Sequence, residues 1–425
     1  MSIEFFLNRM LLLILSKYNL LNMKKIIFSV LILPLILSCT HQSESEKELS
    51  YVVMLSVDGF RWDYADKVAT PNLDKIARMG VKAESLKASF PTKTFPNHYS
   101  MATGLYPDHH GIVLNSFFDP PTGQHYSIFD REAVEDGYFY GGEPIWVTAE
   151  NQGVISGSYF WVGSEAEIKG VRPTYWKKYE HKFPYKQRID SVISWLQKPD
   201  EIRPHLVLWY FDEPDHTGHV FGPDSQELED KIIELDFLIG YFIAEIEKLP
   251  IADKINVIVT SDHGMANISD ERRVALEDNL TMEWVAEMQG YNPNYNIKVK
   301  DGYIDSIYNQ LEKIEHISFW KSEMVPERFH YGSNDRTLDF VVVADSSWSL
   351  VPSLEKSVGF GAHGYDNNNK DMHAVFHAYG PAFKENYTSP SFNNVDIYPL
   401  IAQILNLKPA EVDGSLDNVK GLLKE

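Results

Sequence analysis

Cysteine is almost absent from this sequence of 425 residues, which contains only Cys39. A single cysteine excludes an intramolecular disulfide, so no disulfide framework stabilises the fold. Positive charge is also scarce, because 39 Lys and Arg stand against 60 Asp and Glu and leave a net charge of −21. A general nucleic-acid binder would be expected to carry a basic footprint, and this composition argues against that class, including binding of nucleic-acid duplexes. A protein this acidic that handles a phosphate-bearing ligand needs positive charge from elsewhere, and bound metal ions are the obvious source.

The apolar run near the N-terminus is short. Residues 23–38 begin with Met23-Lys24-Lys25 and continue as an apolar stretch interrupted by Pro34, which is typical of a signal peptide and not of a membrane span. The run ends at Ile36-Leu37-Ser38-Cys39, which resembles a bacterial lipobox and predicts a lipid anchor on Cys39. The alternative is a simple secretory signal with an incidental cysteine. Residues 1–22 are an upstream extension or follow from a misassigned start codon.

Residues 39–50 are polar and acidic and are expected to form a tether. The first 38 residues carry four Lys or Arg and one Glu, so the chain from Cys39 onward has a net charge of −24. The acidity therefore belongs to the folded part of the protein. We expect an exported protein, periplasmic or anchored to the outer membrane of a bacterium, that contacts the membrane only through the lipid on Cys39.

From residue 51 onward, short apolar runs alternate with helical stretches. This alternation predicts an α/β fold with helices on both faces of a sheet. The segment from about 265 to 360 is less readable and is predicted to carry a small subdomain or lid over the site. Buried strands are expected at 51–57, 205–211, 255–261 and 338–344, and helices are expected from a Thr70 cap to near Gly80 and over 225–249.

An aspartate follows each of the three clearest strands within four residues. These are Asp58, Asp212 with Asp215, and Asp262. A single aspartate in such a place is usually a helix cap or a turn residue. In open α/β sheets, however, ligands bind outside the carboxyl ends of the strands. Three carboxylates that converge there indicate a metal site.

Histidines complete this pattern. His219 follows Asp215 in Asp212–His219 (DEPDHTGH), where Pro214 and Gly218 predict a loop, and His263 directly follows Asp262. His363 lies among glycines that would let the backbone approach another segment. Three aspartates and three histidines are a mixture that Zn²⁺ accepts, and they are enough for two ions. The other candidates are interpreted as surface or packing residues, namely His109, His110, His216, His373 and His377.

Thr94 lies where a helix is expected to begin. Pro96 suits the first turn of a helix that runs to Gly104. Backbone N–H groups at that N-terminus would attract an anion. Thr94 is then either an N-cap residue or, beside two metal ions that lower the pKa of its hydroxyl, a nucleophile.

Taken together, the motifs resemble the nucleotide pyrophosphatase/phosphodiesterase family of the alkaline phosphatase superfamily. The resemblance covers essentially all of residues 51–425, which would form the phosphodiesterase catalytic domain. The sequence lacks the flanking domains of the larger animal members of the family and so resembles the compact bacterial form. The family implies an alkaline-phosphatase-like three-layer α/β/α sandwich with a largely parallel central sheet and a small inserted subdomain. The matching motifs are Asp58-Gly59, PTKTFPNH (91–98), TGLYP (103–107), HGI (110–112), EPD with GH (213–219), SDHGM (261–265), GAHG (361–364), YGPAFK (379–384) and NVDIYP (394–399).

The resemblance also implies roles for individual residues. One Zn²⁺ would be held by Asp215, His219 and His363, and the second by Asp58, Asp262 and His263, with Thr94 bridging toward the second ion as the nucleophile. Asn115 matches the asparagine that hydrogen-bonds a phosphate oxygen, although a turn asparagine is the alternative. Phe95 and Tyr179 would stack the base, and Trp161 and Glu165 are weaker candidates for the same pocket. Tyr179 could equally be a core aromatic residue.

The expected activity is hydrolysis of nucleoside triphosphates, dinucleoside polyphosphates and nucleotide phosphodiesters to nucleoside 5'-monophosphates, through a threonyl-phosphate intermediate. The partner is then a small-molecule substrate, and a monomer is favoured. The alternatives on the same fold are a glycerophosphodiester or lysophospholipid headgroup phosphodiesterase and a phosphomonoesterase. No arginine lies in the motifs where a monoester dianion would need a clamp, which disfavours the monoesterase. A non-enzymatic surface lipoprotein is a third possibility, but no nucleophile or metal ligand is missing.

Overall fold

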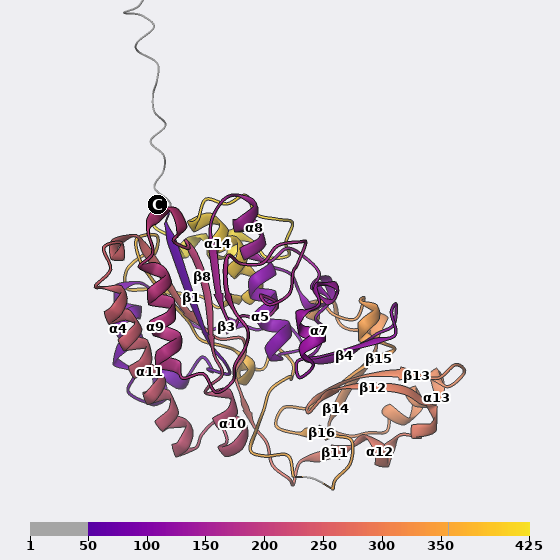
Figure 1. Cartoon of the computed structure of the whole chain (residues 1–425). Coiled ribbons are helices and arrows are strands. Elements are labelled where there is room, and N and C mark those ends of the chain that lie inside the picture. The colour runs from indigo at the N-terminus through magenta and orange to yellow at the C-terminus, as the bar shows by residue number, and fades with distance from the viewer. Residues whose placement is uncertain (1–49, 356) are drawn as a thin grey trace, which may run out of the picture. The chain divides into compact units, whose positions relative to one another are not determined.

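An eight-stranded sheet with the order β19-β2-β18-β9-β1-β8-β6-β7 forms the centre of the fold (Figure 1). The strands β9, β1, β8, β6 and β7 are parallel, and β18 runs antiparallel to its neighbours β9 and β2. The α/β prediction is therefore confirmed. The strands are β19 (Tyr387–Ser389), β2 (Val81–Ala83), β18 (Phe376–Tyr379), β9 (Ile255–Thr260), β1 (Tyr51–Val57), β8 (Leu206–Phe211), β6 (Ser156–Tyr159) and β7 (Tyr175–Lys177).

The side chains of β1 alternate between two hydrophobic cores. Val52 and Met54 belong to one core, and Val53 and Leu55 belong to the other. Successive side chains of a strand point to opposite faces of a sheet, so a strand that is apolar throughout must be covered on both faces. This explains why the predicted strand reads as a continuous apolar run.

Helices cover both faces of this sheet. The helices α4 (Pro71–Met79), α9 (Tyr185–Leu196) and α11 (Gln226–Ile246) pack on one face, where α11 contacts both of the others. The helices α5 (Thr94–Thr103), α8 (Ile145–Asn151) and α14 (Ile397–Ile404) pack on the other (Figure 1). The result is a three-layer α/β/α sandwich.

A second, smaller sheet has the order β12-β13-β15-β14 and is antiparallel throughout. Its strands are β12 (Val285–Tyr291), β13 (Asn294–Val299), β15 (Phe340–Ala344) and β14 (Ile317–Lys321), and α13 (Ile304–Leu311) packs into the same hydrophobic cluster. This is the subdomain predicted for 265–360. The strand predicted at 338–344 corresponds to β15 in this sheet, so it does not follow the other three predicted strands into the central sheet.

The two predicted helices on the first face are confirmed as α4 and α11. The Ser225 hydroxyl caps α11 by accepting a hydrogen bond from Leu228 N. Thr70 precedes α4, but its side chain makes no cap, and this part of the prediction was wrong. Asp236 of α11 instead accepts hydrogen bonds from the backbone N–H groups of Asn72 and Leu73. A neighbouring helix therefore supplies the carboxylate that the N-terminus of α4 attracts.

Short elements connect these layers, and some of them line the site. They are α3 (Tyr64–Lys67), β3 (Leu86–Lys87), α6 (Pro107–His110), β4 (Ser116–Asp119), β5 (Gln124–Ser127), α7 (Arg131–Glu135), α10 (Asp215–Phe221), β10 (Ala266–Asn267), β11 (Arg273–Ala275), α12 (Leu276–Asn279), β16 (Ser349–Val351), β17 (Gly361–Ala362), β20 (Phe392–Asn393) and α15 (Leu416–Val419).

The computed structural model describes residues 50–355 and 357–425. The predicted upstream extension, signal peptide, lipid-anchored Cys39 and acidic tether lie outside the described residues. Within the described part of the chain, no helix combines the length and the hydropathy needed to cross a bilayer.

Candidate active site

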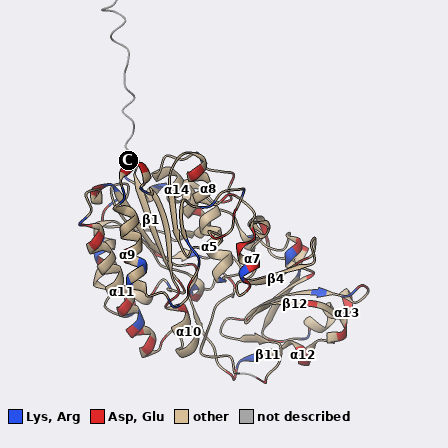
Figure 2. Ribbon diagram, in the orientation of Figure 1, with Lys and Arg blue, Asp and Glu red and all other residues tan. Residues whose placement is uncertain are grey.

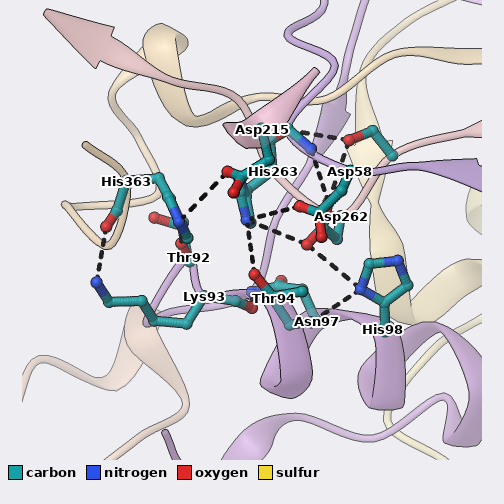
Figure 3. A network of polar contacts seen from close by, with 12 residues as sticks. Asp58, Thr92, Lys93, Thr94, Asn97, His98, Asp215, Asp262, His263 and His363 are labelled. Carbon is teal, nitrogen blue, oxygen red and sulfur yellow. Dashed lines mark hydrogen bonds and ion pairs between the residues drawn. The ribbon is translucent and has the colours of Figure 1, made fainter. Parts of the chain in front are cut away.

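Three aspartates meet at the carboxyl ends of neighbouring parallel strands (Figure 3). Asp58 follows β1, Asp262 follows β9 by two residues, and Asp215 begins α10 just beyond β8. Asp58 and Asp262 are almost fully buried, at 2% and 0% exposure. The predicted convergence therefore occurs, and it occurs because β8, β1 and β9 lie side by side in parallel.

The histidines at this site share one hydrogen-bonding pattern. Each Nδ1 faces a backbone carbonyl: His219 that of Gly361 at 2.7 Å, His263 that of Gly264 at 2.9 Å, and His363 that of Thr92 at 2.7 Å. A carbonyl only accepts, so each Nδ1 carries the proton and each Nε2 keeps a free lone pair. This arrangement orients a metal-binding histidine and fixes its tautomer.

The bare Nε2 atoms face carboxylate oxygens. His263 Nε2 lies 3.1 Å from Asp262 Oδ2 and 3.4 Å from Asp58 Oδ1. Asp215 Oδ1 lies 3.4 Å from the Nε2 of His219 and 3.6 Å from that of His363. All three of these carboxylate oxygens are buried and accept no hydrogen bond. The lone pairs of these nitrogen and oxygen atoms face one another in a buried site and repel one another unless positive charge lies between them. The residues therefore fit bound metal cations.

Two groups of ligand atoms are compact enough to hold an ion. One comprises Asp58, Asp262 and His263, and the other comprises Asp215, His263 and His363. His219 reaches the second group through its approach to Asp215. The six predicted ligands thus lie together, whereas their division between two ions stays a prediction.

The segment that carries Asp215 and His219 is a helix and not the predicted loop. The helix α10 spans Asp215–Phe221, with Pro214 at its N-cap. Proline is tolerated at the start of a helix because the first N–H groups need no helical acceptor. Gly218 lies inside this helix, and Gly361 packs against it so closely that a Cβ on Gly361 would lie 2.3 Å from Gly218 O. The helix places Asp215 and His219, four residues apart, on one face.

Gly59 has a similar function beside Asp58. It has a positive φ of 69°, and a Cβ there would lie 2.8 Å from the Cα of Asp215. Its N–H donates to Asp262 Oδ1 at 3.2 Å. Only glycine allows this backbone approach, which brings all three aspartates into one site.

Burial and mutual repulsion dominate the electrostatics of these carboxylates. Burial, followed by the charges of Asp262 and Asp215, raises the pKa of Asp58 well above its usual value. Burial also raises the pKa of Asp262, but the neighbouring His263 and His98 outweigh it and hold that pKa low. Burial lowers the pKa of His363 well below its usual value, which keeps its imidazole neutral and able to bind a metal.

Thr94 is the first residue of α5, as predicted, and its Oγ1 lies 3.3 Å from His263 Nε2. Its side chain makes no cap, and Lys93 occupies the N-cap position. Both compact groups of ligand atoms found in the structure contain His263, so the hydroxyl lies beside them (Figure 3).

Asn115 lies beside the start of the same helix. Its Oδ1 accepts a hydrogen bond from Phe95 N at 3.0 Å, which fixes the orientation of the amide. Within the described chain, Nδ2 has no hydrogen-bond partner, and Asn115 lines the pocket. The free Nδ2–H groups suit the predicted role of donating to a phosphate oxygen.

Several residues that were not assigned a role also contact the site. The Lys93 ammonium is buried and donates to the carbonyls of Asn292 (2.7 Å) and His363 (2.9 Å), and burial lowers its pKa to about 7. His98 Nδ1 lies 2.9 Å from Thr94 O and 3.3 Å from Asp262 Oδ2. The Tyr210 hydroxyl donates to Asp58 Oδ2 at 2.5 Å. His98 could have been predicted from the sequence, because it lies four residues after Thr94 and therefore on the same face of one helix. Tyr210 lies within an apolar strand, and nothing in the sequence connects it to the site.

A pocket of about 1000 Å³ contains Thr94 and the metal-binding groups. The four residues predicted to bind the nucleoside also line it, namely Phe95, Tyr179, Trp161 and Glu165. Tyr179 packs edge-on against Phe160, with the ring centroids 5.2 Å apart, and is partly exposed to the pocket. Tyr179 thus packs against the core and also lines the pocket, and its binding role stays a prediction. Trp161 is almost fully buried, and its Nε1 donates to His98 O.

Glu165 forms the polar end of this region. Its carboxylate pairs with Arg131 and accepts a hydrogen bond from Tyr179 N at 3.2 Å. Burial raises the pKa of Glu165, although Arg131 opposes the shift. Elsewhere acidic residues are spread along helices such as α11, where Asp and Glu far outnumber the single lysine, Lys231 (Figure 2).

Most of the histidines that were interpreted from the sequence as surface or packing residues lie at the surface or in the core. His109 is exposed and pairs with Asp413, while His110, His373 and His377 are buried away from the aspartates. His216 differs, because it is exposed on α10 and lines the pocket. It lies there because α10 is a helix that forms part of the pocket wall.

Comparison with known proteins supports what this geometry indicates. Residues 52–366 match the family described as type I phosphodiesterase/nucleotide pyrophosphatase. The chain belongs to this family. It is 35% identical over 401 residues to the human ectonucleotide pyrophosphatase/phosphodiesterase family member 5, which covers 94% of this chain and 83% of the human protein. It is also 35% identical over 404 residues to a bis(5'-adenosyl)-triphosphatase of Xenopus laevis, with 93% and 87% covered.

Solved structures of this phosphodiesterase family share the fold. The murine family member 5, solved as an inactive variant in complex with AMP, superposes with a TM-score of 0.85 at 37% identity and covers 88% of this chain and 100% of its own. The human family member 5 gives 0.84 at 36% identity, with the same coverage. The alkaline-phosphatase-like fold predicted from the motifs is therefore confirmed. These relatives are animal proteins, so the compact bacterial form stays a prediction.

Proposed function

We propose that this protein is a two-zinc nucleotide pyrophosphatase/phosphodiesterase that releases nucleoside 5'-monophosphates. The observation that carries the proposal is the position of the Thr94 hydroxyl, 3.3 Å from the histidine common to both candidate metal groups, in a chain of this family. Carboxylate and imidazole ligands with a fixed Nδ1–H suit zinc.

The residues that would hold the two ions are the six described above, with Asp215, His219 and His363 around one and Asp58, Asp262 and His263 around the other. Bound zinc would supply Lewis-acid charge that lowers the pKa of a nearby hydroxyl and balances phosphate oxygens. The buried carboxylate oxygens without hydrogen bonds support this assignment.

Thr94 would act as the nucleophile. Its Oγ bonds to phosphorus and gives up its proton to solvent, while the bond from phosphorus to the leaving oxygen breaks and its electron pair goes to that oxygen. Water then cleaves the threonyl-phosphate, which frees the nucleoside monophosphate and restores the hydroxyl. Asn115 Nδ2 would donate to a non-bridging oxygen, because its Oδ1 is already bound to Phe95 N. Two displacements give net retention of configuration at phosphorus.

Phe95 and Tyr179 would hold the base. Both line the pocket with Thr94. One relative is named a bis(5'-adenosyl)-triphosphatase, and the murine relative was solved in complex with AMP. The Trp161 and Glu165 side chains would complete this end of the pocket.

The protein would be exported and held at a membrane by a lipid on Cys39. This part of the proposal rests on the lipobox-like sequence and on the absence of any other cysteine. Incorporation of a radiolabelled fatty acid that is lost in Cys39→Ala would support it, and labelling that survives this change would contradict it.

A panel of substrates tests the proposed activity. The purified protein is assayed on ATP, diadenosine triphosphate, p-nitrophenyl-TMP, p-nitrophenyl phosphate and glycerophosphocholine, with and without chelator. We expect AMP or TMP from the first three, and loss of that activity with chelator. Release of choline from glycerophosphocholine, without action on nucleotides, would indicate the headgroup phosphodiesterase. A preference for p-nitrophenyl phosphate would indicate a phosphomonoesterase.

A further inference from the structure

The pocket offers little positive charge to a substrate. Its lysine and arginine side chains are Lys93 and Arg131. Lys93 donates to two backbone carbonyls, and Arg131 pairs with Glu165 and Glu135. Both cations are therefore already engaged. Among the described residues, no lysine or arginine that lines the pocket is therefore free to pair with the terminal phosphates of a nucleoside triphosphate.

The pocket offers an unpaired aromatic ring instead. Tyr291 lines it at the end of β12 and is 76% exposed. Within the described chain, its side chain makes no hydrogen bond and no ring contact. An aromatic side chain so exposed at the wall of a ligand pocket has a free face on which a planar group can stack.

The backbone next to this tyrosine is anchored through its neighbour, Asn292. Asn292 Oδ1 accepts from Leu350 N at 3.0 Å, and its Nδ2 donates to Ser349 Oγ at 3.1 Å. The Asn292 carbonyl accepts from the Lys93 ammonium, and Lys93 directly precedes Thr94. The turn that presents Tyr291 is thus tied to the start of α5 and, through the same ammonium, to the His363 carbonyl.

The aromatic residues of the pocket come from separate parts of the fold. Phe95 and Tyr179 belong to the central α/β sandwich, and Tyr291 belongs to the inserted sheet. A substrate that placed one nucleoside against Phe95 and Tyr179 would have its scissile phosphate at Thr94. The cavity of about 1000 Å³ leaves room for a second ring system beyond that phosphate.

We propose that Tyr291 forms a stacking subsite for the group that leaves, so that the enzyme prefers substrates capped by a second nucleoside over nucleoside triphosphates. The preference follows from an uncharged aromatic surface in a pocket whose described lysine and arginine side chains, Lys93 and Arg131, are already engaged. It rests on the proposed function, because it assigns the second half of the substrate of the same site.

ATP and diadenosine triphosphate are the matched pair for a test. Both contain an adenylyl group and three phosphates, and they differ in the adenosine that caps the third phosphate. We compare the kcat/KM ratio of the capped to the uncapped substrate in the wild type, Tyr291→Ala and Tyr291→Phe. The control is Phe237→Ala on α11, an aromatic residue of similar exposure (72%) that does not line the pocket.

We expect the wild type to favour diadenosine triphosphate. Tyr291→Ala should lower the ratio at least about fivefold with little change in kcat/KM for ATP, since stacking on an aromatic ring is lost only for the capped substrate. Tyr291→Phe should keep the ratio, and Phe237→Ala should leave it unaltered. Calorimetric binding of both nucleotides to Thr94→Ala, with and without Tyr291→Ala, should show the same difference without turnover.

Two results would overturn this assignment: a wild type that favours ATP, or a Tyr291→Ala variant that loses activity equally on both substrates. A failure of the proposed function looks different, because neither nucleotide would then yield AMP and neither would bind to Thr94→Ala.

Discussion

Thr94 Oγ1 lies 3.3 Å from Nε2 of His263, and His263 is the residue shared by both candidate metal groups. The His263 Nδ1 donates to the Gly264 carbonyl, so Nε2 carries no proton to donate to the threonine. The contact therefore places a hydroxyl next to an atom suited to bind metal. This is the arrangement that an activated nucleophile requires.

Removal of the Thr94 hydroxyl should abolish turnover without loss of metal. We expect Thr94→Ala to lower kcat on p-nitrophenyl-TMP by about a thousandfold or more, because no other group in the site can replace the nucleophile. Zinc content, measured by mass spectrometry of the metal, should stay near wild type because the six aspartates and histidines remain. Thr94→Ser keeps the hydroxyl and should retain part of the rate. Substantial residual kcat in Thr94→Ala would argue against a covalent role.

Loss of a metal ligand should cost both metal and rate. Asp215→Asn and His363→Ala each remove a ligand from the group at the start of α10, and we expect zinc affinity to fall by at least ~100-fold in each. The measurement is competition with a chromophoric chelator alongside kcat. His109→Ala is the control, because that histidine is exposed and pairs with Asp413 at the surface. An unaltered metal count in both ligand variants would contradict the assignment.

The base-binding role of Phe95 and Tyr179 can be separated from catalysis. Each alanine variant should lose ~1–3 kcal/mol of transition-state binding for a nucleotide, because a stacked ring is removed. The loss should be absent for bis-p-nitrophenyl phosphate, which has no nucleoside. The measurement is therefore the ratio of kcat/KM for ATP to that for this diester. If the ratio stayed at its wild-type value in both variants, these rings would not bind the base.

Buried histidines remote from the metal groups should make the protein sensitive to acid. Burial lowers the pKa of His377 to about 4, and that of His373 to about 4. In the unfolded chain a histidine has its ordinary pKa of about 6.5, so below that pH the folded state binds fewer protons than the unfolded state. The free energy of unfolding therefore decreases as pH falls from about 6.5 toward 4.

Urea denaturation at pH 7 and pH 5 measures this loss. His377→Gln should narrow the difference in unfolding free energy between the two pH values, because glutamine does not titrate. His109→Gln should leave the difference unchanged. The prediction is wrong if the His377 variant loses as much stability on acidification as the wild type.

The central strands could be predicted from sequence because their burial on both faces makes them continuously apolar. The carboxylates at their ends were found for the same reason, since parallel neighbouring strands must end at one edge. The strand at 338–344 has the same apolar character, and nothing local distinguishes a strand of the central sheet from one of the inserted sheet. Only the pairing with β13 and β14 decides that.

Other features depend on contacts between distant segments. Gly218 was interpreted as a helix breaker, yet it lies inside α10, where the distant Gly361 packs against its carbonyl. Asp236 caps a helix more than 150 residues earlier in the chain. Lys93 stands in the same motif as Thr94, but its bonds to Asn292 and His363 become apparent only when the inserted sheet is in place. The Tyr291 ring belongs to that sheet and has no sequence signal that would connect it to the site.

The most direct test of the central claim is acid quench of the enzyme during turnover of labelled ATP, followed by peptide mass spectrometry. If Thr94 is the nucleophile of a nucleotide-cleaving enzyme, the peptide that contains Thr94 carries covalently bound AMP, and the adduct is absent in Thr94→Ala. Label on a different residue, or steady release of AMP with inversion at phosphorus and no adduct at any time point, would contradict the account.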